Sequence, residues 1–190
     1  MSLRIFVEGN DDKNLILKIL NHLKKENEIQ VNDNINFNNY ITILGSKSNL
    51  LKSSETKYKR ISRKIGFEIK KTLFIFDCDF EEDDNICGGL NKSKECFTKL
   101  KDELNWNIDI DYYIFDKNLD YFLLTTIDNN SCFDKFKSLE ECLKIENIKK
   151  NKKPIANLYR DLYPTQGFDF SHPNFNELKT KLKNLFEGMI

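Results

Sequence analysis

Three carboxylate residues stand directly after two apolar stretches of the chain. Glu8 follows residues 4–7, and Asp77 and Asp79 follow residues 72–76. A stretch that is apolar at nearly every position is typical of a buried strand in an α/β sheet. Ligands of such sheets bind at the carboxyl ends of the strands, so the three carboxylates are expected to meet if the two strands are neighbours. Because ionised carboxylates repel one another, such a site favours a hard divalent cation, Mg²⁺ or Mn²⁺.

Strand-like and helix-like segments alternate through the first two-thirds of the chain. Apolar runs bounded by turn residues predict four strands, at residues 3–7, 40–44, 72–76 and 111–115. Apolar residues at three- and four-residue steps predict helices between them, over residues 15–23, 49–67 and 93–104. Alternation of this kind implies right-handed crossovers. The sequence therefore predicts an α/β fold with a mostly parallel four-stranded sheet flanked by helices.

The last third of the chain shows helical patterns alone. They predict four helices, over residues 119–127, 132–148, 154–162 and 174–186. We therefore divide the chain into an α/β core, residues 1–117, and a helical C-terminal subdomain, residues 118–190, that packs on the core.

Composition and charge exclude several classes of protein. The chain has 190 residues, 39% of them hydrophobic, so it is long and apolar enough to bury a core. Its 30 basic and 30 acidic residues cancel, so any binding to nucleic acid must use a local patch rather than the overall charge. No stretch approaches the roughly 18 continuous apolar residues of a membrane span, and no membrane association is expected.

The cysteines bear on the redox state of the protein. They are odd in number, form no C-x-x-C pair and follow no signal-like N-terminal segment. This usage predicts reduced thiols in a cytoplasmic protein, at Cys78, Cys87, Cys96, Cys132 and Cys142. Since Cys78 lies between the two aspartates of a strand end, its side chain is expected to point to the opposite face, into the core.

The order of the carboxylate motifs resembles a known catalytic domain. A strand followed by Glu8-Gly9, and a later strand followed by Asp77-x-Asp79, are similar to the Toprim domain. That domain occurs in topoisomerases, bacterial primases, maturase-type ribonucleases and overcoming-lysogenization-defect (OLD) nucleases. The resemblance covers roughly residues 3–116. It implies a Mg²⁺ or Mn²⁺ ion held by Glu8, Asp77 and Asp79, with Glu8 also acting as general acid or base.

Other positions extend this resemblance toward small stand-alone Toprim-like proteins and OLD-type nucleases. Their E-G-x-x-[ED] pattern is matched at Asp12, and their acidic residue after the last core strand is matched at Asp120. The resemblance implies that both supply further metal ligands. A lysine shortly before an alanine, here Lys153 or its neighbour Lys152, would neutralise charge that develops during catalysis.

A third motif lies after the second predicted strand. The family tends to carry G-[GS]-K there, and this chain has Gly45-Ser46-Lys47. Backbone N–H groups at the start of a helix bind phosphate well, so these residues are candidates for phosphate binding. An ordinary strand-to-helix turn explains the same residues equally well.

The resemblance implies a metal-dependent nuclease. Because no topoisomerase tyrosine motif, ATPase domain or zinc-binding primase module accompanies the core, the expected reaction is phosphodiester cleavage in DNA or RNA. Nucleic acid is then the expected partner. Stand-alone members act alone, as homodimers or beside a separately encoded ATPase, and the sequence does not choose between these arrangements.

Other interpretations remain open for the same residues. Glu8 can act as a helix cap, Asp11 or Asp12 is well suited as the N-cap of the first helix, and charged loop residues can be ordinary surface. The whole chain can also be a non-catalytic Toprim-like domain that binds nucleic acid or a nucleotide. A minor alternative is a haloacid-dehalogenase-like phosphatase, which also has an apolar strand ending in D-x-D, although that family's D-x-D-x-[TV] is not matched by Phe80-Glu81 after Asp79.

Overall fold

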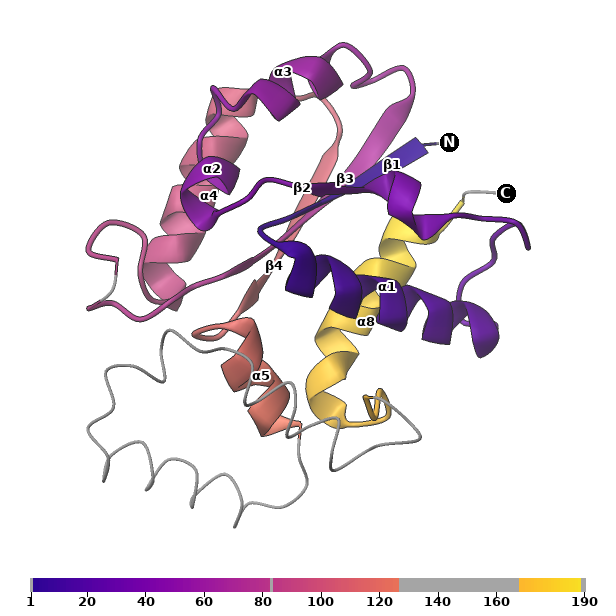
Figure 1. Cartoon of the computed structure of the whole chain (residues 1–190). Coiled ribbons are helices and arrows are strands. Elements are labelled where there is room, and N and C mark those ends of the chain that lie inside the picture. The colour runs from indigo at the N-terminus through magenta and orange to yellow at the C-terminus, as the bar shows by residue number, and fades with distance from the viewer. Residues whose placement is uncertain (1, 83, 127–167, 189–190) are drawn as a thin grey trace.

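A single parallel sheet organises the molecule. The computed structural model describes residues 2–82, 84–126 and 168–188. Its four strands run in the order β2-β1-β3-β4, and each neighbouring pair is parallel (Figure 1). The strands are β1 (Ser2–Val7), β2 (Ile41–Ile43), β3 (Ile69–Asp77) and β4 (Asp109–Phe115). The prediction of an α/β fold with a four-stranded parallel sheet is confirmed.

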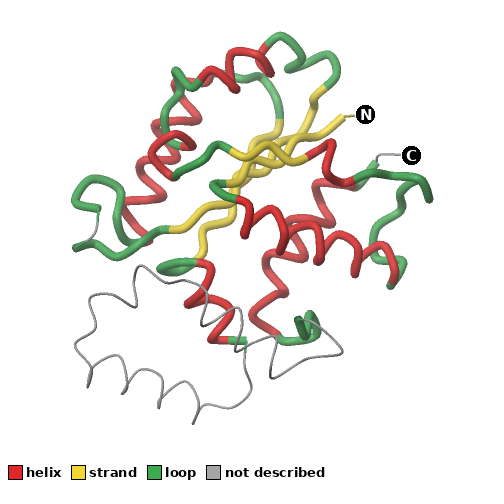
Figure 2. The backbone as a smooth tube through the Cα atoms, viewed as in Figure 1, coloured by secondary structure: helices red, strands yellow, loops and turns green. Residues whose placement is uncertain are grey.

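Alternating side chains give this sheet two apolar faces. Along β3, Leu73 and Ile75 belong to one hydrophobic cluster, and Phe74 and Phe76 belong to the other. This is the two-residue period of a strand, with both sides buried. The strands, yellow in Figure 2, cross the middle of the molecule between the helices that cover these faces. Both faces must therefore be covered for the sheet to be stable.

One face is covered by helices from opposite ends of the chain. Helices α1 (Asn10–Lys25) and α8 (Asn176–Phe186) lie on the same side of the sheet (Figure 1). Their buried leucines join one cluster with β1 and β3, and α5 (Leu119–Thr125) joins the same cluster. Two short 3₁₀ helices, η1 (Phe37–Tyr40) and η3 (Pro173–Phe175), add Phe37 and Phe175 to it. The described part of the C-terminal third thus shares its core with the sheet.

The other face is built largely from aromatic rings. It is covered by α2 (Lys47–Leu50), α3 (Thr56–Ser62) and α4 (Leu90–Leu104). Phe6 stacks on Phe74 with ring centroids 4.7 Å apart, and Phe74 meets Phe97 edge to face at 5.2 Å. Such pairs add stabilisation to the area that they bury.

The single helix predicted over residues 49–67 is wrong, because the chain forms two helices there. Helix α2 ends at Leu50, and Glu55 caps the start of α3 by accepting a hydrogen bond from the Lys57 N–H. The buried Tyr58 donates its hydroxyl to the Leu50 carbonyl at 2.5 Å. In a continuous helix that carbonyl would instead accept the N–H of the residue four positions later. Tertiary packing of one tyrosine therefore overrides the helical pattern.

The predicted N-cap of the first helix also needs correction. Helix α1 is capped by Gly9, so neither Asp11 nor Asp12 is the capping residue. Asp12 stands at the third helical position, where its Oδ2 accepts a hydrogen bond from the Gly9 N–H at 2.8 Å. A carboxylate in the first turn is still favourable, because it lies at the positive end of the helix dipole.

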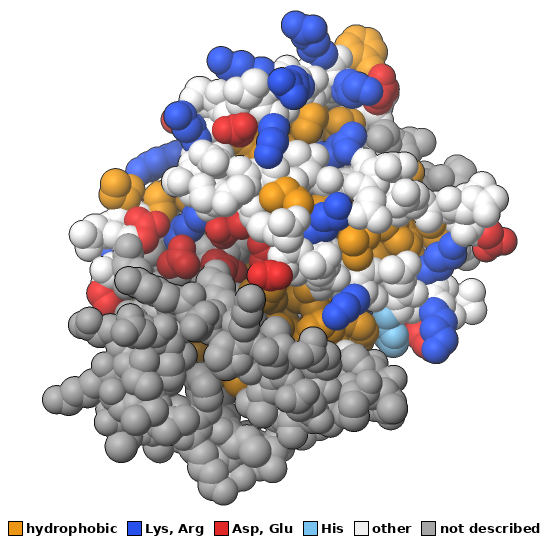
Figure 3. Space-filling model, in the orientation of Figure 1, with side chains coloured by type: hydrophobic (Ala, Val, Ile, Leu, Met, Phe, Trp, Pro, Cys, Tyr) orange, Lys and Arg blue, Asp and Glu red, His pale blue; other side chains and the backbone are white. Residues whose placement is uncertain are grey.

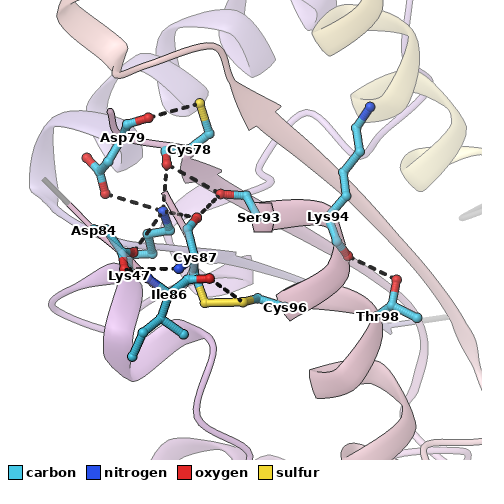
Figure 4. Close-up of a disulfide and its surroundings, with 10 residues drawn as sticks. All are labelled: Lys47, Cys78, Asp79, Asp84, Ile86, Cys87, Ser93, Lys94, Cys96 and Thr98. Carbon is cyan, nitrogen blue, oxygen red and sulfur yellow. Dashed lines mark hydrogen bonds and ion pairs between the residues drawn. A yellow bond between two sulfur atoms is a disulfide. The ribbon is translucent and has the colours of Figure 1, made fainter. Parts of the chain in front are cut away.

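The expectation that all cysteines are reduced is wrong for two of them. Cys87 and Cys96 form a disulfide between the loop after β3 and α4, as Figure 4 shows. Because disulfides are rare in reducing compartments, cysteine usage no longer supports the cytoplasmic expectation. Cys78 is a free thiol, 1% exposed, as predicted.

Some predictions fall on residues that the structure does not describe. The helices predicted over residues 132–148 and 154–162 lie there, together with Lys153, Cys132 and Cys142. Of the helices that the structure does describe, none is both long enough and apolar enough to cross a membrane.

Candidate carboxylate site

A small cavity lies where the carboxyl ends of the central strands meet. Its volume is about 150 Å³, and four separate segments of the chain line it. The lining residues are Glu8, Gly9, Asp11, Asp12, Gly45, Asp77, Asn118, Leu119 and Asp120. Sheet order explains this convergence, since β1 and β3 are neighbours and Val7 pairs with Ile75. The cavity thus occupies the edge of the sheet at which α/β proteins bind ligands.

Glu8 and Asp77 are linked directly across the two strand ends. The Glu8 Oε1 accepts a hydrogen bond from the Asp77 N–H at 2.7 Å. The Asp77 Oδ1 in turn accepts the N–H of Leu119, at the start of α5, at 3.0 Å. A carboxylate held by a backbone N–H has a fixed orientation, because the donor belongs to a rigid element. These bonds fix both side chains at the cavity.

The cavity raises the pKa of one of its carboxylates strongly. The pKa of Glu8 rises from 4.5 to about 7. Burial is the largest cause, and the charges of Asp12 and Asp79 add to it. The Asp77 N–H and the Lys47 ammonium act in the opposite direction but do not cancel the effect. A glutamate of this kind exchanges its proton near neutral pH, as a general acid or base must.

Asp79 lies beside the cavity rather than in its lining. Its backbone has φ = 55°, in the left-handed region, and its N–H donates to the Lys117 carbonyl at 2.7 Å. Its Oδ2 lies 3.5 Å from the Lys47 Nζ. The Asp79 charge still reaches Glu8, whose pKa it raises. The structure therefore brings Glu8, Asp12, Asp77 and Asp120 together at the cavity and places Asp79 on its rim.

The three residues predicted to bind phosphate make different contacts in the structure. Gly45 lines the cavity with φ = 96°. Ser46 caps α2, where its Oγ accepts the Asn49 N–H at 3.2 Å. Lys47 is buried, and its ammonium donates to the carbonyls of Cys78 and Cys87 at 2.7 and 2.8 Å. Phosphate binding by this segment stays a prediction, and in this structure the ammonium is engaged by protein atoms.

The donor atoms of the cavity suit a hard cation, although the side chains do not surround a point. Carboxylate oxygens are the ligands that Mg²⁺ and Mn²⁺ prefer. As placed, no three His, Cys, Asp or Glu side chains within residues 2–82, 84–126 and 168–188 are close enough together to hold a metal ion. A cation would therefore require these carboxylates to close around it.

The surface around the cavity is visibly acidic. Figure 3 shows acidic side chains gathered near the middle of one face, whereas basic side chains dominate the upper part of that face, over α3. A chain with no net charge thus separates its charges into patches. Such separation gives a neutral protein local electrostatic attraction.

Two features of the site were missed by sequence reasoning. Asn118 and Leu119 line the cavity, and the signal for Asn118 was its type and position, because it caps α5 by accepting the Tyr121 N–H at 2.9 Å. The engagement of Lys47 had no local signal, because its partners are some thirty to forty residues away.

Comparison with known proteins adds no further constraint on this site. No family model, curated protein or solved structure matches the chain. The function must therefore be argued from the geometry of the carboxylate cavity itself.

Proposed function

We propose that this protein is a Mg²⁺- or Mn²⁺-dependent nuclease that cleaves phosphodiester bonds of nucleic acid at the carboxylate cavity. The observation that carries the proposal is the contact between Glu8 and Asp77 at the ends of two neighbouring parallel strands. The order of Glu8-Gly9 and Asp77-x-Asp79 along the chain resembles the Toprim domain, which supports the same reaction class.

The electrostatics of the cavity support a cationic cofactor. Burial together with neighbouring carboxylates holds the pKa of Glu8 near 7, so the charged form of Glu8 is disfavoured in the metal-free protein. A divalent cation would relieve this repulsion. Glu8 and Asp77 would hold it, with Asp12 and Asp120 as further ligands and Asp79 at the rim.

The residues of the chain would divide the chemistry between them. A bound cation supplies Lewis-acid stabilisation of the phosphodiester oxygens and activates water. In the metal-free protein Glu8 exchanges its proton near neutral pH, and the Asp77 N–H holds its carboxylate in place. Asp77 in turn fixes the start of α5, because it accepts the Leu119 N–H. The fold thus holds Glu8 and Asp77 beside each other, and the remaining carboxylates would close around the cation.

Metal binding and cleavage test this proposal together. Thermal unfolding is measured against Mn²⁺ and Mg²⁺, and the same protein is incubated with single-stranded and duplex DNA and RNA oligonucleotides. A ligand at about 100 times its Kd stabilises the folded state by about 2.7 kcal/mol, which is readily measured as a rise in Tm. We expect that rise in the wild type and metal-dependent cleavage of at least one oligonucleotide.

Two variants make the test specific to the cavity. Asp77→Asn removes a carboxylate of the site, and we expect it to abolish both the metal-dependent rise in Tm and cleavage. Asp102→Asn removes a carboxylate from the exposed face of α4 and should change neither. If metal stabilises neither the wild type nor Asp102→Asn, the proposal is wrong, and the carboxylates serve to hold strand and helix ends together.

A further inference from the structure

Lys47 is buried, and its ammonium is surrounded by four oxygen-bearing groups. Its side chain is 7% exposed, and lysine is rarely buried to this extent unless it is paired. The Nζ donates to the carbonyls of Cys78 and Cys87 at 2.7 and 2.8 Å. It also lies 3.5 Å from Asp79 and 3.3 Å from Asp84, as the dashed lines of Figure 4 show. These contacts engage the three ammonium protons, and the two carboxylates carry one more negative charge than the ammonium neutralises.

All four partners belong to one short segment, the loop that leaves β3. Lys47 itself follows β2, and the sheet order places β1 between β2 and β3. The lysine side chain therefore spans the end of β1, where Glu8 stands. It ties an edge strand to the loop that carries Asp79. Among the ion pairs of the described residues, those of Lys47 are the ones with a buried ammonium.

Asp79 needs such an anchor because its backbone is in a rarely occupied conformation. A residue with a side chain seldom adopts φ = 55° unless its surroundings hold it there. Backbone hydrogen bonds to the Lys117 carbonyl and from the Gly89 N–H fix the main chain of Asp79. The Asp79 carboxylate in turn contacts the Lys47 ammonium. The backbone and the side chain are thus fixed by separate interactions.

The loop is further fixed from the side of α4. Ser93 is fully buried, and its Oγ donates to the same Cys87 carbonyl that Lys47 binds, at 2.6 Å. Asp84 accepts the N–H groups of Ile86 and Cys87, both at 3.0 Å. At Gly88, a Cβ would lie 2.3 Å from the Asp84 carbonyl, so a side chain there would disrupt the turn. Lys47 is therefore the central contact of a tightly packed loop.

We propose that Lys47 is the positioning residue of the carboxylate site, acting on the cation through Asp79. This inference rests on the proposed metal-dependent function and extends it to a residue outside the cavity lining. Lys47 keeps the Asp79 carboxylate on the rim, 3.5 Å from its own ammonium, and restrains the loop from Cys78 to Cys87. Without the ammonium the Asp79 carboxylate loses this contact. A cation must then order the carboxylate when it binds, which lowers the affinity for the cation.

The test is direct measurement of Mn²⁺ affinity, with free Mn²⁺ followed by electron paramagnetic resonance. Residues that orient metal ligands typically change affinity by 10- to 100-fold when they are replaced, so we expect Lys47→Gln to weaken Mn²⁺ binding by about that factor. The Mn²⁺ concentration for half-maximal cleavage should rise equally, whereas the rate at saturating Mn²⁺ should change by less than about threefold. Lys92→Gln is the matched control, because Lys92 makes an exposed ion pair with Glu81 in the same loop.

A double-mutant cycle separates action through Asp79 from general damage. If Lys47 acts through Asp79, Lys47→Gln should have little further effect on Mn²⁺ affinity in an Asp79→Asn background. Additive effects, or a Lys47→Gln protein that binds Mn²⁺ as tightly as the wild type, would overturn the inference. Should wild-type protein bind no Mn²⁺ at all, it is the proposed function that fails, and the two failures are thereby distinguished.

A measurement on the wild type keeps the inference testable if Lys47→Gln does not fold. Protons of a buried ammonium exchange slowly enough to be observed by ¹⁵N-lysine NMR, and the Lys47 resonance can be assigned from its absence in Lys47→Arg. Substoichiometric Mn²⁺ should broaden that resonance more than the resonance of any exposed lysine, because Lys47 lies beside Asp79. Equal broadening across all lysines would contradict the inference.

Discussion

Two groups of carboxylates lie near the end of β3: the cavity group, which contains Glu8 and Asp77, and the loop group, which contains Asp79 and Asp84. The surroundings of Glu8 and of Asp84 shift their pKa values in opposite directions. In the cavity, burial and, to a smaller extent, the charges of Asp12 and Asp79 raise the pKa of Glu8 to about 7. In the loop, the Cys87 N–H, the Ile86 N–H and Lys47 hold the pKa of Asp84 below its ordinary value, with the Cys87 bond as the largest cause. Asp77 of the cavity and Asp79 of the loop are only two positions apart in the chain.

The difference shows how one strand end can serve both function and stability. A carboxylate whose pKa is raised on folding lowers the free energy of unfolding at high pH, whereas one whose pKa is lowered increases it. The cavity group therefore stores unfavourable electrostatic free energy that a cation would release. The loop group compensates by tying the neighbouring chain firmly in place. Functional sites commonly show such a division between strained and stabilising contacts.

The largest expected effect is on catalysis. Replacing Glu8 by glutamine removes the group proposed to transfer protons, so cleavage should fall by roughly 10²- to 10⁴-fold. The fold should remain, since the amide oxygen can still accept the Asp77 N–H. Initial cleavage rates at saturating Mn²⁺ measure the effect, with Asp102→Asn as the charge-matched control. A Glu8→Gln protein that cleaves at the wild-type rate would remove Glu8 from the mechanism.

Breaking the disulfide should weaken the loop group and leave the cavity group intact. Closing a loop of this length stabilises a protein by about 2–3 kcal/mol in the chain-entropy model, so Cys96→Ser should lower the free energy of unfolding by about that amount. Urea unfolding with and without a thiol reductant measures it. Reductant should destabilise the wild type and have no further effect on Cys96→Ser. If Cys96→Ser remains sensitive to reductant, the Cys87–Cys96 bond is not responsible.

The raised pKa of Glu8 predicts that the free energy of unfolding depends on pH. With a chelator present to remove metal, the pKa of Glu8 is 4.5 in the unfolded chain and about 7 in the folded protein. Because the folded value is the higher one, ionisation of Glu8 destabilises the folded state as the pH rises from 4.5 through about 7. Glu8→Gln should therefore be more stable than the wild type at pH 8, by about 3 kcal/mol, and the difference should vanish below pH 4.5. Urea unfolding across this range tests the sign. A destabilised Glu8→Gln protein at pH 8 would show that the cavity does not disfavour the charged glutamate.

Asp84 should show the opposite sign and the smallest effect. Its folded pKa is lowered, so its contribution is present above its unfolded pKa of 3.8 and is lost as pH falls through the folded value. Because its side chain is 31% exposed, solvent screens the pair with Lys47, and Asp84→Asn should cost about 1 kcal/mol at pH 7. The difference from wild type should disappear in acid. A difference that persists at low pH would point to the turn rather than to the charge.

Much of the fold followed from local sequence pattern. The strand ending at Phe76 was predicted from its apolar run, and it is confirmed as the core of β3. The amphipathic repeat from Leu15 to Leu23 forms part of α1, because apolar residues at that period share one face when the segment is helical, and that face packs against the sheet. The convergence of Glu8 and Asp77 followed from the rule that parallel strands present the same ends together.

The remainder depended on contacts between distant residues. Tyr58 divides a predicted helix because its hydroxyl finds the Leu50 carbonyl, which no periodicity reveals. The pairing of Cys87 with Cys96 required α4 to begin directly after the Gly88-Gly89 turn and to return toward the loop. Lys47 was read as a phosphate ligand from its motif, whereas its buried contacts with Cys78 and Asp79 depend on the sheet order.

The central position of β1 has a consequence for how the molecule is made. Ile5 pairs with Ile41 on one side and with Leu73 on the other, so β1 is synthesised before both of the strands that pair with it. Long-range parallel pairing forms slowly, because the chain must close large loops before it gains contacts. On the ribosome, β1 must therefore wait for β3 with its apolar face uncovered. The carboxylate cavity cannot exist before that moment, which makes its assembly a late event in folding.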